Sequence, residues 1–124
     1  MSQLALVADD DPLMRRLCQA LLEQAGCAVI MTDNGQEAVE LARRELPLLI
    51  ILDVVMAKMT GLNALRELKL DESTKAIPVI MISGTPDRQT QETSAAWGAA
   101  AFFKKPFRAA EMQEVIRHLI QQPN

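Results

Sequence analysis

Polar side chains of three kinds stand at the ends of short apolar runs in this sequence, and together they could handle a phosphoryl group. The set contains three aspartates, one hydroxyl residue and one amine, namely Asp9, Asp10, Asp53, Ser83 and Lys105. Carboxylates that are brought together repel each other unless a cation or protons neutralise them. Mg²⁺ suits such a group because it prefers carboxylate and carbonyl oxygens and keeps some of its waters. A carboxylate nucleophile beside Mg²⁺, a hydroxyl donor and an ammonium group is what phosphoryl transfer requires.

The elements that must position these residues alternate, five times over, between short apolar runs and longer segments of helical periodicity. This alternation is typical of a parallel sheet built from βα units. The predicted strands are Leu4–Ala8, Ala28–Thr32, Leu48–Asp53, Val79–Ile82 and Ala100–Lys104. The third run is apolar up to its final aspartate, so we place it at the centre of the sheet. We therefore expect one α/β domain over residues 1–124, a doubly wound five-stranded parallel sheet with five helices on both faces.

The helical segments differ in how firmly they should be held. Four carry apolar stripes at helical spacing, clearest from Met112 to Ile120, whereas Pro86–Trp97 is polar and weakly periodic and predicts a loosely held helix. Turn and capping residues mark the ends of these segments: Asp11-Pro12, Gly26, Asn34-Gly35 and Gly98. Ligands of open parallel sheets bind outside the carboxyl ends of the strands, which is where the polar set would converge.

Composition excludes several classes of protein. Hydrophobic residues make up 49% and charged residues 23% of the chain, and the net charge is -3, so we expect neither disorder nor a basic surface for nucleic acid. The apolar stretch Leu46–Leu52 is far too short to span a bilayer, and no signal-peptide core precedes Asp9, so we expect a cytoplasmic protein without membrane contact. The spacing of Cys18 and Cys27 fits neither a redox nor a zinc motif, which favours two buried thiols.

Four segments give the chain a resemblance to a known family over its whole length. They are the acidic cluster in Leu6–Pro12, the segment Asp53–Gly61, the strand Pro78–Gly84 and the sequence Phe103-Lys104-Lys105-Pro106-Phe107. In this order and at these strand ends, they resemble the CheY-like receiver domains of two-component response regulators. The resemblance implies the strand order 2-1-3-4-5 and a cis peptide bond before Pro106.

The resemblance also implies a role for each polar residue. Asp53 would be the phosphoacceptor; Asp10 and Asp53 would ligate Mg²⁺ directly, Asp9 would act through a metal-bound water, and Val55 would offer its backbone carbonyl. Ser83 would bond a phosphoryl oxygen after transfer, and Lys105, rather than Lys104, would pair with the phosphate. Phe102 occupies the aromatic switch position, so Ser83 and Phe102 together would form the switch.

Two departures from the family pattern concern the segment after Asp53. Ala57 stands where the family usually has proline, so the loop loses one fixed φ angle and should be more adaptable. Thr60 replaces an acidic residue that is common there, and we expect no function for it. Two positions after Asp53 and Ser83, Val55 and Thr85 are best placed to orient or exclude the water that hydrolyses the acyl phosphate. Val55 can neither donate to nor accept from that water, which predicts a long-lived phosphoprotein.

The resulting expectation is a phosphorylation switch rather than an enzyme. The phosphoryl donor would be a histidine kinase or histidine phosphotransferase, and an output partner would bind the face made by the fourth helix, fifth strand and fifth helix. A pseudo-receiver that docks without phosphorylation is the alternative, although the intact acidic, hydroxyl and lysine set disfavours it. A phosphatase of the aspartyl-nucleophile kind would need a general acid where Val55 stands, and a flavodoxin-like cofactor binder would be repelled by Asp9-Asp10-Asp11.

Overall fold

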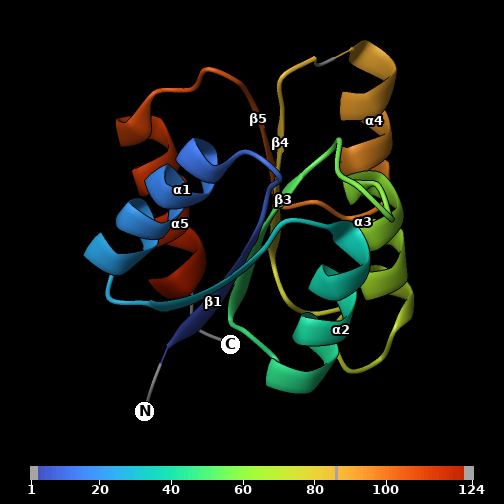
Figure 1. The fold of residues 1–124 in the computed structure, drawn as a ribbon, viewed down its shortest axis with the longest axis horizontal. Helices are drawn as coiled ribbons and strands as arrows, with labels where there is room; N and C mark the ends of the chain where they lie inside the picture. The colour runs from blue at the N-terminus through green and yellow to red at the C-terminus, as the bar shows by residue number, and fades with distance from the viewer. Residues whose placement is uncertain (1–2, 86, 122–124) are drawn as a thin grey trace.

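The computed structural model describes residues 3–85 and 87–121 and forms a three-layer α/β sandwich (Figure 1). Its five parallel strands lie in the order β2-β1-β3-β4-β5. The strands are β1 (Leu4–Ala8), β2 (Ala28–Thr32), β3 (Leu49–Asp53), β4 (Val79–Ser83) and β5 (Ala101–Lys104). The predicted sheet, its order and its central third strand are thereby confirmed, with three strand ends displaced by a single residue.

Five helices connect the strands and cover both faces of the sheet. They are α1 (Pro12–Gln24), α2 (Gly35–Glu45), α3 (Gly61–Leu70), α4 (Arg88–Ala96) and α5 (Ala109–Gln121). Helices α1 and α5 lie on one face, and α2, α3 and α4 lie on the other (Figure 1). Two apolar cores result, one on each side of the sheet, and every residue of β3 and β4 is buried between them. Such burial on both faces explains why those strands are apolar almost throughout.

Side-chain caps fix where α1, α2 and α3 begin. Asp11 accepts a hydrogen bond from the Leu13 N–H at 3.0 Å, and Asn34 accepts one from the Glu37 N–H at 2.8 Å. Thr60, for which no role was expected, caps α3 by accepting from the Asn63 N–H at 3.2 Å. Each cap satisfies an N–H group that the first helical turn leaves without a partner.

The fourth helix is shorter than predicted and weakly anchored, as its polar sequence indicated. It runs over Arg88–Ala96 rather than Pro86–Trp97, because Asp87 caps its first turn and Trp97 ends it. Pro86 lies outside the described residues, and Ser94 is the only buried residue of the helix.

Within residues 3–85 and 87–121, no helix is long and apolar enough to cross a membrane. Cys18 and Cys27 are buried free thiols, as predicted.

Candidate functional site

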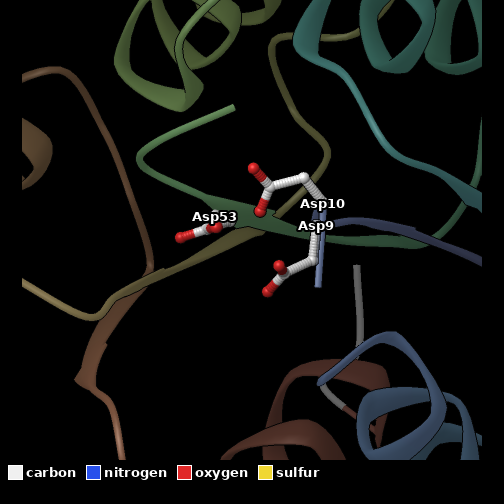
Figure 2. Close-up of side chains that lie close together, drawn as sticks. All are labelled: Asp9, Asp10 and Asp53. Atoms are coloured by element: carbon white, nitrogen blue, oxygen red, sulfur yellow. The ribbon is translucent and has the colours of Figure 1, made fainter. Parts of the chain in front are cut away.

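Three aspartate side chains converge at the carboxyl ends of β1 and β3 (Figure 2). Asp9 and Asp10 directly follow β1, and Asp53 is the last residue of β3, its neighbour in the sheet. One carboxylate oxygen of each lies within 4.8 Å of those of the other two. Asp9 and Asp53 are buried, at 0% and 4% exposure, whereas Asp10 is exposed. The structure therefore brings together the acidic residues that the sequence singled out.

Lys105 completes this cluster from the loop after β5. Its Nζ lies 3.0 Å from Asp9 Oδ2 and 3.4 Å from Asp53 Oδ2. Burial lowers the pKa of Lys105, but the two carboxylates outweigh burial, so its pKa lies above the usual value. Lys104, the neighbouring candidate, is exposed, and the peptide bond between Lys105 and Pro106 is cis, as the family resemblance implied.

The environment of Asp53 opposes its negative charge. Burial is the main cause, and the charge of Asp9 adds to it, while Lys105 acts in the opposite direction. Together they raise the pKa of Asp53 from 3.8 to about 6. A carboxylate in this state gains from a neighbouring cation, because the cation offsets both the lost hydration and the repulsion from Asp9.

The two carboxylate oxygens of Asp9 have different partners. Its Oδ1 accepts a hydrogen bond from the Asp11 N–H at 2.9 Å, and Arg15 Nη1 donates to its backbone carbonyl at 2.7 Å. Its Oδ2 is buried and has the Lys105 ion pair but no aligned hydrogen bond. Sequence reasoning missed Arg15, because nothing in the spacing shows that a side chain in α1 returns to the carbonyl of Asp9.

The acidic cluster fits a hard divalent cation. All three side chains offer oxygen ligands, one carboxylate oxygen lacks an aligned hydrogen bond, and Asp10 faces solvent where coordinated waters could remain. Mg²⁺ binds through one or two carboxylates together with several waters, which this set can supply. The predicted water-mediated role of Asp9 and direct roles of Asp10 and Asp53 stay predictions.

The hydroxyl and aromatic candidates lie on the two strands beyond β3. Ser83 ends β4 and is 1% exposed, and its Oγ accepts a hydrogen bond from the Thr85 N–H at 3.3 Å. Phe102 lies in β5, half-buried against the core on the α2–α4 side of the sheet. Thr85 is exposed in the loop that follows Ser83. All three lie where the sequence placed them, and their roles stay predictions.

The loop between Asp53 and α3 is the last part of the site. Val55 is 60% exposed there, and the Gly61 N–H donates to the Val54 carbonyl at 2.8 Å, which closes the loop on itself. Lys58 has a φ of 69°, a left-handed conformation that costs a lysine more than it would cost glycine. Ala57 stands in this loop where the family usually has proline, and the expectation that the loop is more adaptable stays a prediction.

The fold and the polar cluster together define a receiver domain, and a comparison with known families agrees. Residues 5–117 match the family model described as the response regulator receiver domain. The chain belongs to this family.

Individual relatives share the fold and part of the sequence. Protein PilH of Pseudomonas aeruginosa is 41% identical over 93 residues, which cover 75% of this chain and 74% of that protein. The receiver domain of the sensor histidine kinase PA1611 from the same species has a TM-score of 0.87 at 25% identity, covering 98% of this chain and 100% of that one. Its structure holds a magnesium ion in the active-site cleft.

Other relatives are longer. The probable transcriptional regulator ycf27 of Guillardia theta is 29% identical over 96% of this chain. The match covers 46% of that regulator, so this chain spans about half the length of such relatives.

Proposed function

We propose that this receiver domain is a phosphorylation switch that accepts a phosphoryl group on Asp53 with the help of Mg²⁺. The observation that carries the proposal is the convergence of Asp9, Asp10 and Asp53 on one another, with Lys105 Nζ within 3.4 Å of two of them. A purely structural site would have no need to bury carboxylates against each other, because such burial is costly. The magnesium ion in the PA1611 receiver domain supports the same choice of metal.

The chain's own residues divide the transfer between them. One oxygen of Asp53 attacks the phosphorus of a phosphohistidine; the new O–P bond forms as the P–N bond breaks, and the imidazole leaves. With a pKa of about 6, Asp53 is mostly ionised at neutral pH and so available as the nucleophile. Mg²⁺, when bound, would neutralise charge on the phosphoryl oxygens. Lys105 would move from the carboxylates to the new phosphoryl group, and Ser83 would donate its hydroxyl to another oxygen.

The output would follow from a shift between two populated states. A phosphoryl group favours the state in which Ser83 and Phe102 lie inward, because Ser83 and Lys105 then gain charge-assisted contacts. The weakly anchored α4, where only Ser94 is buried, and the neighbouring β5 and α5 are where rearrangement costs least. We therefore assign the partner surface to α4, β5 and α5, and the phosphoryl donor to a histidine kinase or histidine phosphotransferase in the cytoplasm.

In this proposal the chain is a substrate that assists its own modification, not an enzyme with turnover. It would bind protein partners rather than nucleic acid, in keeping with a net charge of -3.

Amide chemical shifts measured before and after phosphorylation test the switch. With Mg²⁺ and a small phosphodonor, we expect changes near Asp53 and, at a distance, across α4, β5 and α5. Asp53→Asn should show neither set. Distant changes confined to α1, around Leu13–Leu22, would contradict the assigned surface. If the unphosphorylated protein still binds a partner through α4, β5 and α5, the alternative of a phosphorylation-independent pseudo-receiver is favoured.

A further inference from the structure

The loop after Asp53 is in close backbone contact with the beginning of α2. The beginning of α2 has no part in the chemistry described so far. Asn34 and Ala57 form an isolated parallel β-bridge between the two segments. Next to the bridge, a Cβ atom on Gly35 would lie 2.1 Å from the Met59 carbonyl oxygen and 2.8 Å from its carbon. Real Cβ contacts do not occur below 3.0 Å, so the two backbones touch where only glycine fits.

Glycine is needed at position 35 for room and not for its backbone angles. Gly26 and Gly98 have positive φ angles, of 93° and 100°, and Gly35 does not. Its position is fixed by Asn34, which is 8% exposed and accepts the Glu37 N–H at 2.8 Å as the cap of α2. The first residues of α2 are therefore held in place, and the backbone of Met59 packs directly against Gly35.

A second backbone contact holds the other end of the same loop. A Cβ atom on Gly61 would lie 2.0 Å from the Asp53 carbonyl oxygen and 2.9 Å from the Val54 Cα. The Gly61 N–H also donates to the Val54 carbonyl at 2.8 Å. The segment that carries the Val55 carbonyl is thus fixed at Gly61 by the strand of Asp53 and at Met59 by α2.

We propose that Asn34 and Gly35 are positioning residues for the metal-binding loop, holding Ala57–Met59 so that the Val55 carbonyl and Asp53 face the same cation. This inference rests on the proposed function, because it assumes that Mg²⁺ binds at this loop. We call these contacts of Asn34 and Gly35 with Ala57 and Met59 the clamp. The clamp restricts the loop from outside, through α2, as a proline at position 57 would restrict it from within. Residues that orient metal ligands without touching the metal commonly change metal affinity 10–100-fold when they are altered.

A Mg²⁺ titration followed by backbone amide shifts tests the clamp without reference to activity. In Gly35→Ala the Met59 carbonyl must move from 2.1 Å to beyond 3.0 Å from the new Cβ. We expect shifted amides at Ala57–Thr60 in the metal-free protein and Mg²⁺ affinity about tenfold weaker. Gln36→Ala, at the exposed next position of α2, should bind Mg²⁺ like the wild type.

Two further comparisons separate positioning from a general loss of stability. Ile116→Val removes a buried methyl group from α5, on the opposite face of the sheet, and should lower the melting temperature while leaving Mg²⁺ affinity unchanged. If Gly35→Ala does not fold, Asn34→Ala and Asn34→Ser decide the matter. Asn34→Ala removes the cap and should weaken Mg²⁺ binding, and Asn34→Ser, which keeps a capping oxygen, should restore it.

The outcomes distinguish this inference from the function on which it rests. If the wild type binds no Mg²⁺, or Asp10→Ala binds it equally well, the proposed metal site is wrong. If the wild type binds Mg²⁺ and Gly35→Ala binds it with the same affinity, only the clamp is wrong. The clamp is also overturned if Ile116→Val weakens binding as much as Gly35→Ala, or if both Asn34 variants bind like the wild type.

Discussion

Single residues of the site are arranged at the expense of the protein's own stability. Asp53 is almost fully buried beside Asp9, and its pKa of about 6 records that the folded protein disfavours the charged form. Lys105 relieves part of this cost through ion pairs of 3.0 Å with Asp9 and 3.4 Å with Asp53. Strain of this kind is typical of functional sites, where selection acts on chemistry at some cost in folding free energy.

Asp53→Asn should therefore make the metal-free protein more stable at neutral pH. Burial and Asp9 raise the pKa of Asp53 from 3.8 in the unfolded chain to about 6, so above pH 6 the folded state must hold a charge that the unfolded state carries more easily. Allowing for solvent screening on the side of the cluster where Asp10 is exposed, we expect the free energy of unfolding to rise by about 1–2 kcal/mol at pH 7.5. Urea unfolding in the presence of a chelator measures the difference.

The pH dependence of that difference gives a further check. As pH falls from 6 toward 4, folded Asp53 takes up a proton before unfolded Asp53 does, so the wild type regains stability and the advantage of Asn should shrink. An advantage for Asn that is absent at pH 7.5, or undiminished at pH 4.5, would contradict this explanation. Asp10→Asn is the matched control, because the exposed carboxylate of Asp10 keeps its contact with solvent in the folded protein. This variant should not show the same gain in stability.

Val55 should set the lifetime of the phosphorylated form. It is 60% exposed, two positions after Asp53, and its β-branched side chain can neither donate to nor accept from an attacking water. We expect Val55→Asn to speed the loss of phosphate about tenfold, because a carboxamide can orient that water. Val55→Ala removes the cover without adding a polar group and should have a smaller effect. The decay of phosphoprotein after removal of the donor measures both, and equal rates for Asn and wild type would refute the argument.

At the scale of elements, the helix ends show where the sequence conflicts with local geometry. The residue that caps the C-terminal end of α2 is Leu46, which has a left-handed backbone conformation with φ 48° and ψ 60°. Its side chain is 54% exposed. The left-handed conformation costs an L-residue about 1–2 kcal/mol, and glycine avoids that cost. Leu46 therefore stores strain at a position remote from the acidic cluster.

Leu46→Gly should stabilise the protein because glycine adopts the left-handed end of a helix without strain. Glycine also gives the unfolded chain more freedom, so the net gain should be about 0.5–1 kcal/mol. Glu45→Gly, one residue earlier and within α2, is the matched control and should destabilise by about 1 kcal/mol. Thermal unfolding of both variants decides the point. A Leu46→Gly variant that melts below the wild type would show that its exposed side chain matters more than its backbone.

At the scale of the whole molecule, the features that follow from periodicity or family resemblance were predictable, and contacts between segments distant in the sequence were not. The strand order, the central β3 and the convergence of Asp9, Asp10, Asp53 and Lys105 follow from apolar periodicity, strand ends and family resemblance. The fit of Gly35 against Met59 depends on how α2 packs against a distant loop, and no local pattern encodes that. The hydrogen bond from Arg15 to the Asp9 carbonyl was missed for the same reason.

The central claim is that Asp53 is the phosphoacceptor, and the mass of the intact protein tests it most directly. With Mg²⁺ and a small phosphodonor, the wild type should gain the mass of one phosphoryl group, and chelation of Mg²⁺ should prevent the gain. Asp53→Asn, which keeps the shape of the side chain but removes the nucleophilic carboxylate, should gain nothing. If Asp53→Asn is labelled as fully as the wild type, the acceptor is another residue, with Asp9 and Asp10 as the next candidates, and the proposed function of Asp53 is wrong.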